Sequence, residues 1–242
     1  MRVVAIIPAA GLGVRMARGR TAQGAAPPKP LLELDAVPIL FWTLRKLAAC
    51  PRIERLIVAV RPADRAGVEA RLRQEDYAGR VRVVDGGESR QESVANALEA
   101  VPAGADLVLV HDAVRPFVEP ALIERVIEAG AETGAAILGL PAADTVKQVE
   151  PAAGGHASRI TATLPRERIV LAQTPQVFRC QLLKEAMAAA ARDGFRASDE
   201  AGLVERLGHP VTVVMGSERN LKITTPADLA LARLLLSQEK TH

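Results

Sequence analysis

Residues 3–16 read VVAIIPAAGLGVRM, and this stretch decides the fold. Residues 3–7 form a short apolar run that predicts a buried strand. Pro8 ends the run, and two glycines follow at Gly11 and Gly13. Glycines let the backbone pass close to a ligand, and successive N–H groups in such a turn can face phosphate oxygens. The stretch therefore predicts a strand that leads directly into a loop able to bind phosphate, and a plain glycine turn is the alternative.

The rest of the chain continues the alternation of short apolar runs and longer amphipathic stretches. Further strands are predicted at residues 55–60, 82–84, 106–110, 135–140 and 211–214. Helices are predicted at residues 38–49, 63–74, 91–100, 120–129 and 180–192, from a Ser198 cap to residue 206, and from Thr225-Pro226 onward. In the last helix, Leu229, Leu231, Leu234 and Leu235 are expected to supply much of the apolar side. Continuous apolar strands separated by helices are typical of an α/β fold with a mostly parallel twisted sheet and helices on both faces.

The alternation stops after Pro141. Residues 145–149 and 159–163 alternate in the manner of strands, and they flank the flexible sequence PAAGG at 151–155. Long loops inside a compact domain usually have a task. We therefore predict one domain over residues 1–242, with a projecting hairpin-like arm at 142–173.

The composition excludes several classes of protein. The chain has 242 residues, of which 49% are hydrophobic and 24% charged, as in ordinary soluble domains. Aromatic residues make up only 2%, which argues against a base-stacking platform for nucleic acid, and the net charge of +3 does not by itself indicate a polyanion partner. No run approaches the roughly 18 apolar residues of a membrane span. Cys50 and Cys180 have no metal-ligand spacing, so a reducing cytoplasm is expected.

Two positively charged residues lie close to the glycine loop in sequence. Arg15 stands within the loop, and its planar guanidinium can donate two hydrogen bonds to a phosphate. Lys29 stands in the sequence PPKP at 27–30, where prolines stiffen the chain and can aim the lysine back at the loop. Both are candidate phosphate ligands, and the alternative for Lys29 is a solvated loop lysine.

Two more segments place polar residues at predicted strand ends. Residues 85–93, DGGESRQES, end one strand and open a helix with Arg90 and Ser93 on one face; a plain capped helix start is the alternative. An apolar strand also delivers Asp112 to the carboxyl edge of the sheet, where a carboxylate can hold Mg²⁺. Arg115 could clamp a phosphate there or simply pair with Asp112. His111 alternates away from Asp112 and is expected to be a packed strand residue.

Two common phosphate-binding folds fit poorly. A dinucleotide-binding fold would have a third glycine where Met16 stands and an acid at the end of the second strand, where the sequence reads Val60-Arg61. A P-loop needs a Gly-Lys dipeptide, which the sequence lacks. The glycine loop therefore matches neither of these two motifs.

The motifs together resemble one family. They are PAAGLGVRM (8–16), PKPLLEL (28–34), DGGESRQESV (85–94), VHDAVRP (110–116), DTVK (144–147), AQTPQVF (172–178), SDEA (198–201) and NLKITTPADL (220–229). In this order, and over nearly the whole chain, they resemble the 2-C-methyl-D-erythritol 4-phosphate cytidylyltransferase family. The resemblance implies a Rossmann-like nucleotidyltransferase fold and transfer of CMP from CTP to methylerythritol phosphate, with release of pyrophosphate. It also implies Mg²⁺, a homodimer joined through the arms, and a place in non-mevalonate isoprenoid biosynthesis.

Carried over motif by motif, the resemblance assigns four groups of residues. The CTP cradle would be Pro8, Ala9, Ala10 and Gly11, with Arg15 and Lys29 on the triphosphate as the catalytic cations. The cytidine would meet Gly87, Arg90, Ser93, Ala113 and, near the ribose, Glu88. Asp112 would organise Mg²⁺. The acceptor would be held by Arg115, Thr174 and Lys222, with Thr145 and Arg166 of the arm reaching it in the partner subunit.

Three rival functions remain open at this point. The nearest is a cytidylyltransferase of the same fold that acts on another polyol phosphate, such as ribitol 5-phosphate. A nicotinamide-dependent oxidoreductase is suggested only by the GxG after the first strand, and Met16 and Arg61 speak against it. The third is a nucleotide-binding regulator without catalysis.

Overall fold

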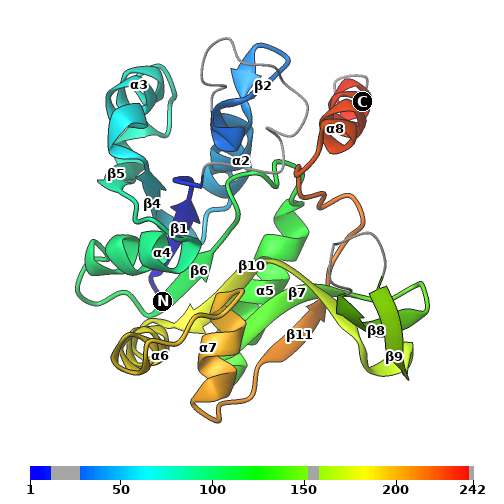
Figure 1. Ribbon diagram of the computed structural model, residues 1–242. Helices are drawn as coiled ribbons and strands as arrows, with labels where there is room; N and C mark the ends of the chain where they lie inside the picture. The colour runs from blue at the N-terminus through cyan, green and yellow to red at the C-terminus, as the bar shows by residue number, and fades with distance from the viewer. Residues whose placement is uncertain (12–27, 152–157, 240–242) are drawn as a thin grey trace.

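The computed structural model describes residues 1–11, 28–151 and 158–239, and its centre is a seven-stranded sheet between two layers of helices (Figure 1). The strand order is β11-β7-β10-β6-β1-β4-β5. These strands are β1 (Val3–Pro8), β4 (Ile53–Val60), β5 (Val81–Asp85), β6 (Leu107–Val110), β7 (Ala135–Pro141), β10 (Val170–Arg179) and β11 (Thr212–Met215). The helices are α2 (Ile39–Ala48), α3 (Pro62–Leu72), α4 (Arg90–Glu99), α5 (Pro120–Thr133), α6 (Cys180–Asp193), α7 (Glu200–Arg206) and α8 (Pro226–Glu239).

The two faces of the sheet follow from the alternation of side chains along each strand. In β1, Val3, Ala5 and Ile7 join the core beneath α2, α3 and α5, whereas Val4 and Ile6 join the core beneath α4, α6 and α7. All five are at most 2% exposed. Because β1 is covered on both faces, its apolar run is continuous, as the sequence predicts.

One strand of the sheet is antiparallel to its neighbours. β10 pairs with β6 and with β7 in the antiparallel sense, while the other pairings in the sheet are parallel. Sequence patterning did not predict β10, because Pro175 lies inside it and proline argues against a central strand. The ladder with β7 is irregular between Gln173 and Gln176, which accommodates the proline. The prediction of a mostly parallel sheet is confirmed, with β10 as the exception.

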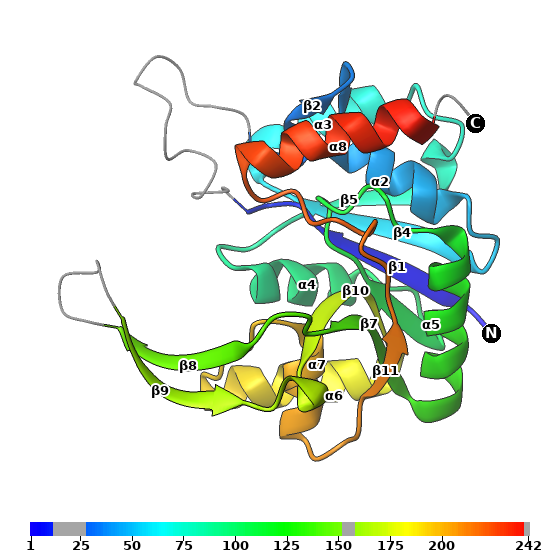
Figure 2. The ribbon, with the colours of Figure 1, turned by 90° about the vertical axis from the view of Figure 1, so that its right-hand side faces the viewer.

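The predicted hairpin-like arm is present as β8 (Val146–Pro151) and β9 (Ser158–Leu164), which pair in the antiparallel sense. Figure 2 shows this hairpin projecting from the body of the domain. Residues 170–173 lie within the predicted bounds of the arm but pair with β7 as part of β10. A second small ladder, β2 (Glu33–Leu34) with β3 (Val37–Pro38), precedes α2 and was not predicted.

Two helix ends and one helix face can be compared with the sequence predictions. Asp199, not Ser198, caps α7, since its side chain accepts a hydrogen bond from the Gly202 amide at 3.1 Å. The predicted start of α8 is confirmed by the Thr225 hydroxyl, which accepts from the Asp228 amide at 3.2 Å.

The predicted apolar side of α8 is wrong for Leu231 and Leu234, which are 47% and 63% exposed. Ala232 and Leu236 are the buried α8 residues instead, packed with the small core of Leu34, Ile39, Val114, Phe117 and Ile223. Across the described ranges, none of the helices has the length and apolar character needed to cross a bilayer.

Two helical glycines provide a paired test of this packing. Gly67 in α3 is exposed, and a Cβ there would meet nothing within 4 Å, so Gly67→Ala should raise the free energy of unfolding by about 0.5–1 kcal/mol. Gly130 in α5 faces Val177 of β10, and a Cβ there would lie 2.6 Å from a Val177 methyl carbon. Gly130→Ala should therefore lower the free energy of unfolding by about 1–3 kcal/mol. Urea unfolding of both variants measures the difference, and equal shifts of the same sign would contradict the packing described.

Candidate functional site

A pocket of about 350 Å³ opens beyond the carboxyl ends of β1 and β6. Its lining is Pro8, Ala10, Gly11, Lys29, Pro30, Arg90, Ser93, Asp112, Ala113, Val114 and Lys222. These residues come from five separate stretches of the sequence. The carboxyl edge of the sheet thus gathers most of the residues that sequence analysis singled out, as expected for an open α/β sheet.

A larger hollow of about 740 Å³ lies beside α2, and its lining contains none of the residues that the sequence motifs singled out. Its arginines already have partners within the fold. Arg45 pairs with Glu75, Arg71 donates to Gln74, and Arg80 donates to two backbone carbonyls. Because these arginines have partners within the fold and none of the lining residues belongs to the sequence motifs, we place the chemistry in the smaller pocket.

The glycine loop begins where β1 ends. The Ala9 amide donates to the Ala59 carbonyl at 2.7 Å, which continues the ladder with β4, and Ala9 itself is buried behind the pocket. Ala10 and Gly11 line the pocket, and a Cβ at Gly11 would meet nothing within 4 Å. Arg15 lies outside the described residues. Lys29 lies at the start of the short helix η1 (Lys29–Leu31) and also lines the pocket.

The segment after β5 forms the next wall. A Cβ at Gly86 would lie 2.5 Å from the Ala10 Cβ, so glycine lets this segment approach the first loop. Ser93, at the first turn of α4, accepts a hydrogen bond from the Gly87 amide at 3.1 Å and donates to the Ser89 carbonyl at 2.8 Å. The capped helix start is real, because Ser89 and Glu92 form a capping box. The same helix start also places Arg90 and Ser93 in the lining of the pocket.

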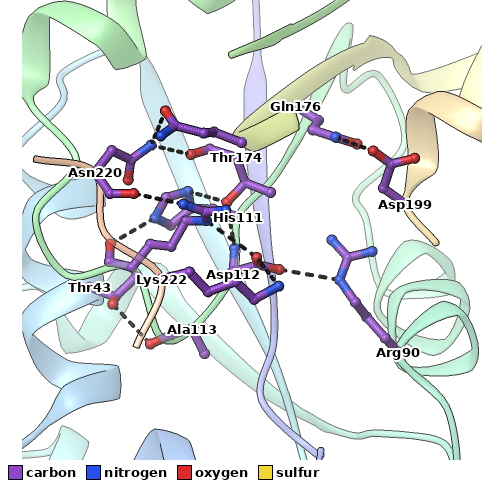
Figure 3. Close-up of polar contacts among 12 residues, drawn as sticks. Thr43, Arg90, His111, Asp112, Ala113, Thr174, Gln176, Asp199, Asn220 and Lys222 are labelled. Carbon is purple, nitrogen blue, oxygen red and sulfur yellow. Dashed lines mark hydrogen bonds and ion pairs between the residues drawn. The ribbon is translucent and has the colours of Figure 1, made fainter. Parts of the chain in front are cut away.

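Asp112 is the centre of the site (Figure 3). Its carboxylate lies 2.8 Å from the Lys222 ammonium, 3.2 Å from Arg90 Nε and 3.4 Å from Arg115 Nε. The residue is only 6% exposed. Burial alone would raise the pKa of Asp112, but the charges of Arg90, Lys222 and Arg115 outweigh it and hold the pKa well below its usual range. Asp112 is therefore a permanent anion within a net positive group.

Thr174 and His111 support Asp112 from the sheet. The Thr174 hydroxyl accepts from the Asp112 amide at 3.0 Å and lies 3.0 Å from His111 Nδ1. His111 Nε2 lies 3.1 Å from the Arg115 carbonyl, which can only accept, so Nε2 carries the proton and Nδ1 accepts from Thr174. Burial lowers the pKa of His111 to about 4, so the ring is neutral at physiological pH. The prediction of a packed histidine is confirmed, although His111 directly follows β6 and is not part of it. The Thr174 hydroxyl belongs to this network and does not line the pocket.

The segment that carries Lys222 is irregular, although a strand-like stretch was expected, and it is tied down on both sides. Arg115 Nη1 donates to the Asn220 carbonyl at 2.6 Å, and Asn220 Nδ2 donates to the Thr174 carbonyl at 2.8 Å. The Ile223 amide donates to the Val114 carbonyl at 3.0 Å. Arg115 is thus buried between Asp112 and this segment and does not line the pocket. The Asp112–Arg115 pair, the alternative to a phosphate clamp, exists in the structure, and Arg115 also fixes the segment that carries Lys222.

Three predicted residues lie away from this pocket in the single chain. Glu88 is exposed at the α4 start, where its amide donates to the Glu92 carboxylate. Thr145 and Arg166 are exposed near the base of the arm, and Arg166 donates to the Ala143 carbonyl at 2.9 Å. Among the described residues, no hydrogen bond or ion pair joins the two arm residues to the Asp112 cluster.

Sequence analysis did not assign roles to three buried polar residues of the site, Glu200, Gln176 and Asn220. Glu200 Oε1 lies 2.7 Å from Arg90 Nη1, and the residue is 1% exposed. Burial raises the pKa of Glu200, although Arg90 opposes that shift. The available signal was the position of Glu200 directly after the α7 cap, within the SDEA motif. Its burial depends on long-range packing and could not be derived from that position.

The donor set restricts the kind of metal ion that could bind. Within residues 1–11, 28–151 and 158–239, no three histidine, cysteine, aspartate or glutamate side chains gather in a way that could hold a metal ion. Asp112 is a single carboxylate facing the pocket. Mg²⁺ often binds one or two carboxylates and completes its shell with substrate phosphates and water. Asp112 therefore fits a cation that is shared with a phosphate ligand, and does not fit a cage made of protein alone.

Comparisons with known proteins agree over nearly the whole chain. A family model described as 2-C-methyl-D-erythritol 4-phosphate cytidylyltransferase matches residues 3–238. Proteins of that name from Acidobacterium capsulatum and Solibacter usitatus are 56% and 51% identical, covering 100% and 99% of this chain and 100% and 97% of their own lengths. The crystal structure of the Thermus thermophilus protein of that name is 39% identical with a TM-score of 0.76, covering 98% of this chain and 100% of that one. The structure of the 4-diphosphocytidyl-2C-methyl-D-erythritol synthase from Anaerococcus prevotii has a TM-score of 0.81 at 29% identity, with 97% and 98% covered.

Proposed function

Because the chain belongs to the 2-C-methyl-D-erythritol 4-phosphate cytidylyltransferase family, it is a nucleotidyltransferase of isoprenoid biosynthesis that uses CTP, and we propose that the reaction takes place in the pocket beside Asp112. The enzyme transfers CMP to 2-C-methyl-D-erythritol 4-phosphate. The products are 4-diphosphocytidyl-2-C-methyl-D-erythritol and pyrophosphate. One observation supports the placement above all: Asp112 and the cations around it share a pocket with the glycine loop and Lys29.

The transfer is a substitution at the α-phosphorus of CTP. A phosphate oxygen of methylerythritol phosphate forms the new P–O bond, and the bond from the α-phosphorus to the bridging oxygen breaks. Pyrophosphate leaves with that electron pair. The attacking oxygen is already an anion, so no general base is needed. The neutral, enclosed His111 fits this conclusion, because its ring is committed to Thr174 and Arg115.

The main barrier is repulsion between two anionic groups, and positive side chains in the pocket reduce it. We assign Lys29 and Arg15 to the triphosphate and Lys222 to the acceptor phosphate, with the loop of Pro8, Ala9, Ala10 and Gly11 against the nucleotide. Gly87, Ser93 and Ala113 are assigned to the cytidine, with Glu88 at its ribose. The anchored segment around Lys222 supports a fixed acceptor position, since orientation itself lowers the barrier. Arg115 and Thr174, both buried, would act on the acceptor by shaping this wall.

We also propose that Asp112 holds Mg²⁺ when the nucleotide binds. The ion would supply positive charge at the phosphate oxygens. Its arrival would require Asp112 to share its carboxylate between the ion and the side chains that now surround it. Both cysteines, Cys50 and Cys180, are buried and free, which supports the proposal that the enzyme works in a reducing cytoplasm.

Pyrophosphate release tests the proposed reaction. The parent enzyme should release pyrophosphate when CTP, Mg²⁺ and methylerythritol phosphate are all present, and release should stop when any one of them is omitted. Ribitol 5-phosphate in place of methylerythritol phosphate should give little or no release. Faster release with ribitol 5-phosphate would assign the chain to that acceptor, and CTP binding without any release would indicate a regulator.

The arm supports a homodimer. Val149 and Ile160 lie opposite each other in the hairpin and are 45% and 58% exposed, and Val170 and Leu171 near its base are 42% and 56% exposed. Apolar side chains gathered on a projecting element are typical of an interface. We propose that two copies join through their arms and that Thr145 and Arg166 of each arm reach the acceptor in the partner subunit.

A pair of neighbouring variants tests the dimer. Ile160→Asp places a charge in the apolar pair and should convert the dimer to monomers, whereas Gln148→Asp, on the opposite face of β8 from Val149, should leave it intact. Sedimentation velocity measures the mass of each variant. A parent that sediments as a monomer, or an Ile160→Asp variant that remains a dimer, would contradict the proposed interface.

A further inference from the structure

Glu200 is a buried carboxylate that does not line the pocket yet is paired with a residue that does. It is the first residue of α7 and 1% exposed. Oε1 lies 2.7 Å from Arg90 Nη1, while Oε2 is buried without a hydrogen-bond partner. Burying a half-paired carboxylate is unfavourable, and a buried ion pair is weak evidence for a stabilising role. A role in placing Arg90 accounts for this arrangement.

Arg90 lies between two carboxylates. Its Nη1 lies 2.7 Å from Glu200 Oε1. Its Nε lies 3.2 Å from Asp112 Oδ1, and Figure 3 shows this second contact. The Arg90 side chain is 29% exposed and forms part of the pocket wall. A guanidinium next to a single carboxylate tends to form two parallel hydrogen bonds with it. The donors of such a fork are Nε and Nη2, as in the pair of Arg45 with Glu75, whereas Nη1 lies on the other edge of the Arg90 guanidinium, where it meets Glu200.

The backbone that carries Glu200 is held firmly against the sheet. Gln176 of β10 donates through Nε2 to Asp199 Oδ2 at 2.8 Å, and its Oε1 accepts from the Ala201 amide at 3.2 Å. The residues on either side of Glu200 are therefore tied to one central side chain. A side chain supported in this way can orient its neighbour with little freedom.

We propose that Glu200 is a positioning residue, which holds the Nη1 edge of Arg90 and thereby keeps the guanidinium in the orientation that faces CTP. This inference rests on the proposed function, because it assumes that CTP binds beside Arg90. It adds a counter-anion, located behind the pocket wall, to the set of residues on which nucleotide binding depends.

Glu200→Gln tests the proposal, because it keeps the shape of the side chain and removes its charge. Glu75→Gln is the matched control, since Glu75 is also a buried carboxylate paired with an arginine, Arg45, and lies outside the pocket. Isothermal calorimetry should show CTP binding about tenfold weaker in Glu200→Gln and unchanged in Glu75→Gln. Thermal unfolding of both variants, measured alongside, reports the purely structural cost.

A double-mutant cycle separates positioning from structure. In an Arg90→Met background, Glu200→Gln should not weaken CTP binding further, because the group through which it acts is gone. An unchanged or tighter CTP affinity in Glu200→Gln, or additive losses in the cycle, would overturn the proposal.

If Glu200→Gln does not fold, Glu200→Asp serves the same test, since its shorter side chain withdraws the carboxylate from Arg90. A parent that releases no pyrophosphate would defeat the proposed function, whereas an active parent with an unaffected Glu200→Gln variant would defeat only this inference.

Discussion

Replacing Asp112 with asparagine is expected to lower turnover by about 100-fold or more. The substitution keeps the shape of the side chain but removes the negative charge that Lys222, Arg90 and Arg115 surround. It also removes the carboxylate proposed to hold Mg²⁺. Repulsion among the three cations would then displace Lys222 from its place in the pocket wall.

The same substitution should reduce stability. Removing one partner of a buried ion pair leaves uncompensated charge, and a loss of about 3 kcal/mol in the free energy of unfolding is expected, at the low end because Lys222 and Arg90 keep some contact with water. Urea unfolding and pyrophosphate release measure the two effects. Asp64→Asn breaks a partly exposed pair with Arg61 outside the pocket and serves as the control. Equal turnover in the two variants would show that Asp112 has no role in the reaction.

Lys29→Ala and Arg15→Ala should each lower turnover by about 100-fold or more, with far smaller effects on stability. Each cation is proposed to stabilise charge that builds up on the triphosphate during the transfer. Lys29 lines the pocket, and Arg15 follows the described part of the glycine loop in sequence. Lys29 does not belong to the apolar cores formed by the described residues, so the fold should survive its removal.

Single-turnover measurements at saturating CTP isolate this effect from nucleotide affinity. Lys184→Ala is the control, because Lys184 is exposed on α6 and does not line the pocket. The variants should unfold at urea concentrations close to the parent value. Unchanged turnover in Lys29→Ala or in Arg15→Ala would refute the role assigned to that residue.

Local pattern accounts for most of the secondary structure. The predicted run at 3–7 lies within β1 (Val3–Pro8), and the predicted helix at 120–129 lies within α5 (Pro120–Thr133). The first is a continuous apolar run that ends at Pro8, and the second has a helical hydrophobic period that begins at Pro120. The same reasoning failed at β10, where Pro175 suggests an interruption that the ladder with β7 absorbs as an irregularity. On α8, Leu231 and Leu234 look like core residues in sequence, yet the helix covers only a small cluster of side chains.

The sequence by itself determined the class of fold, the family, and the residue types of the site. Strand and helix periods are local, and glycine or proline at a strand end constrains the backbone wherever that strand is placed. The order of the motifs along the chain likewise identifies the family. These properties depend on near neighbours along the chain and can be derived without a structure.

Only the tertiary structure decided which of these residues share a pocket and what each contacts. Asp112 meets Lys222 and Arg90 because β6, α4 and the segment before α8 converge at one edge of the sheet. Thr174 and Arg115 are committed to internal hydrogen bonds, and Glu200 is buried behind Arg90. The physical reason is that Coulomb attraction, burial and hydrogen bonding depend on distance in space, which separation along the chain does not specify.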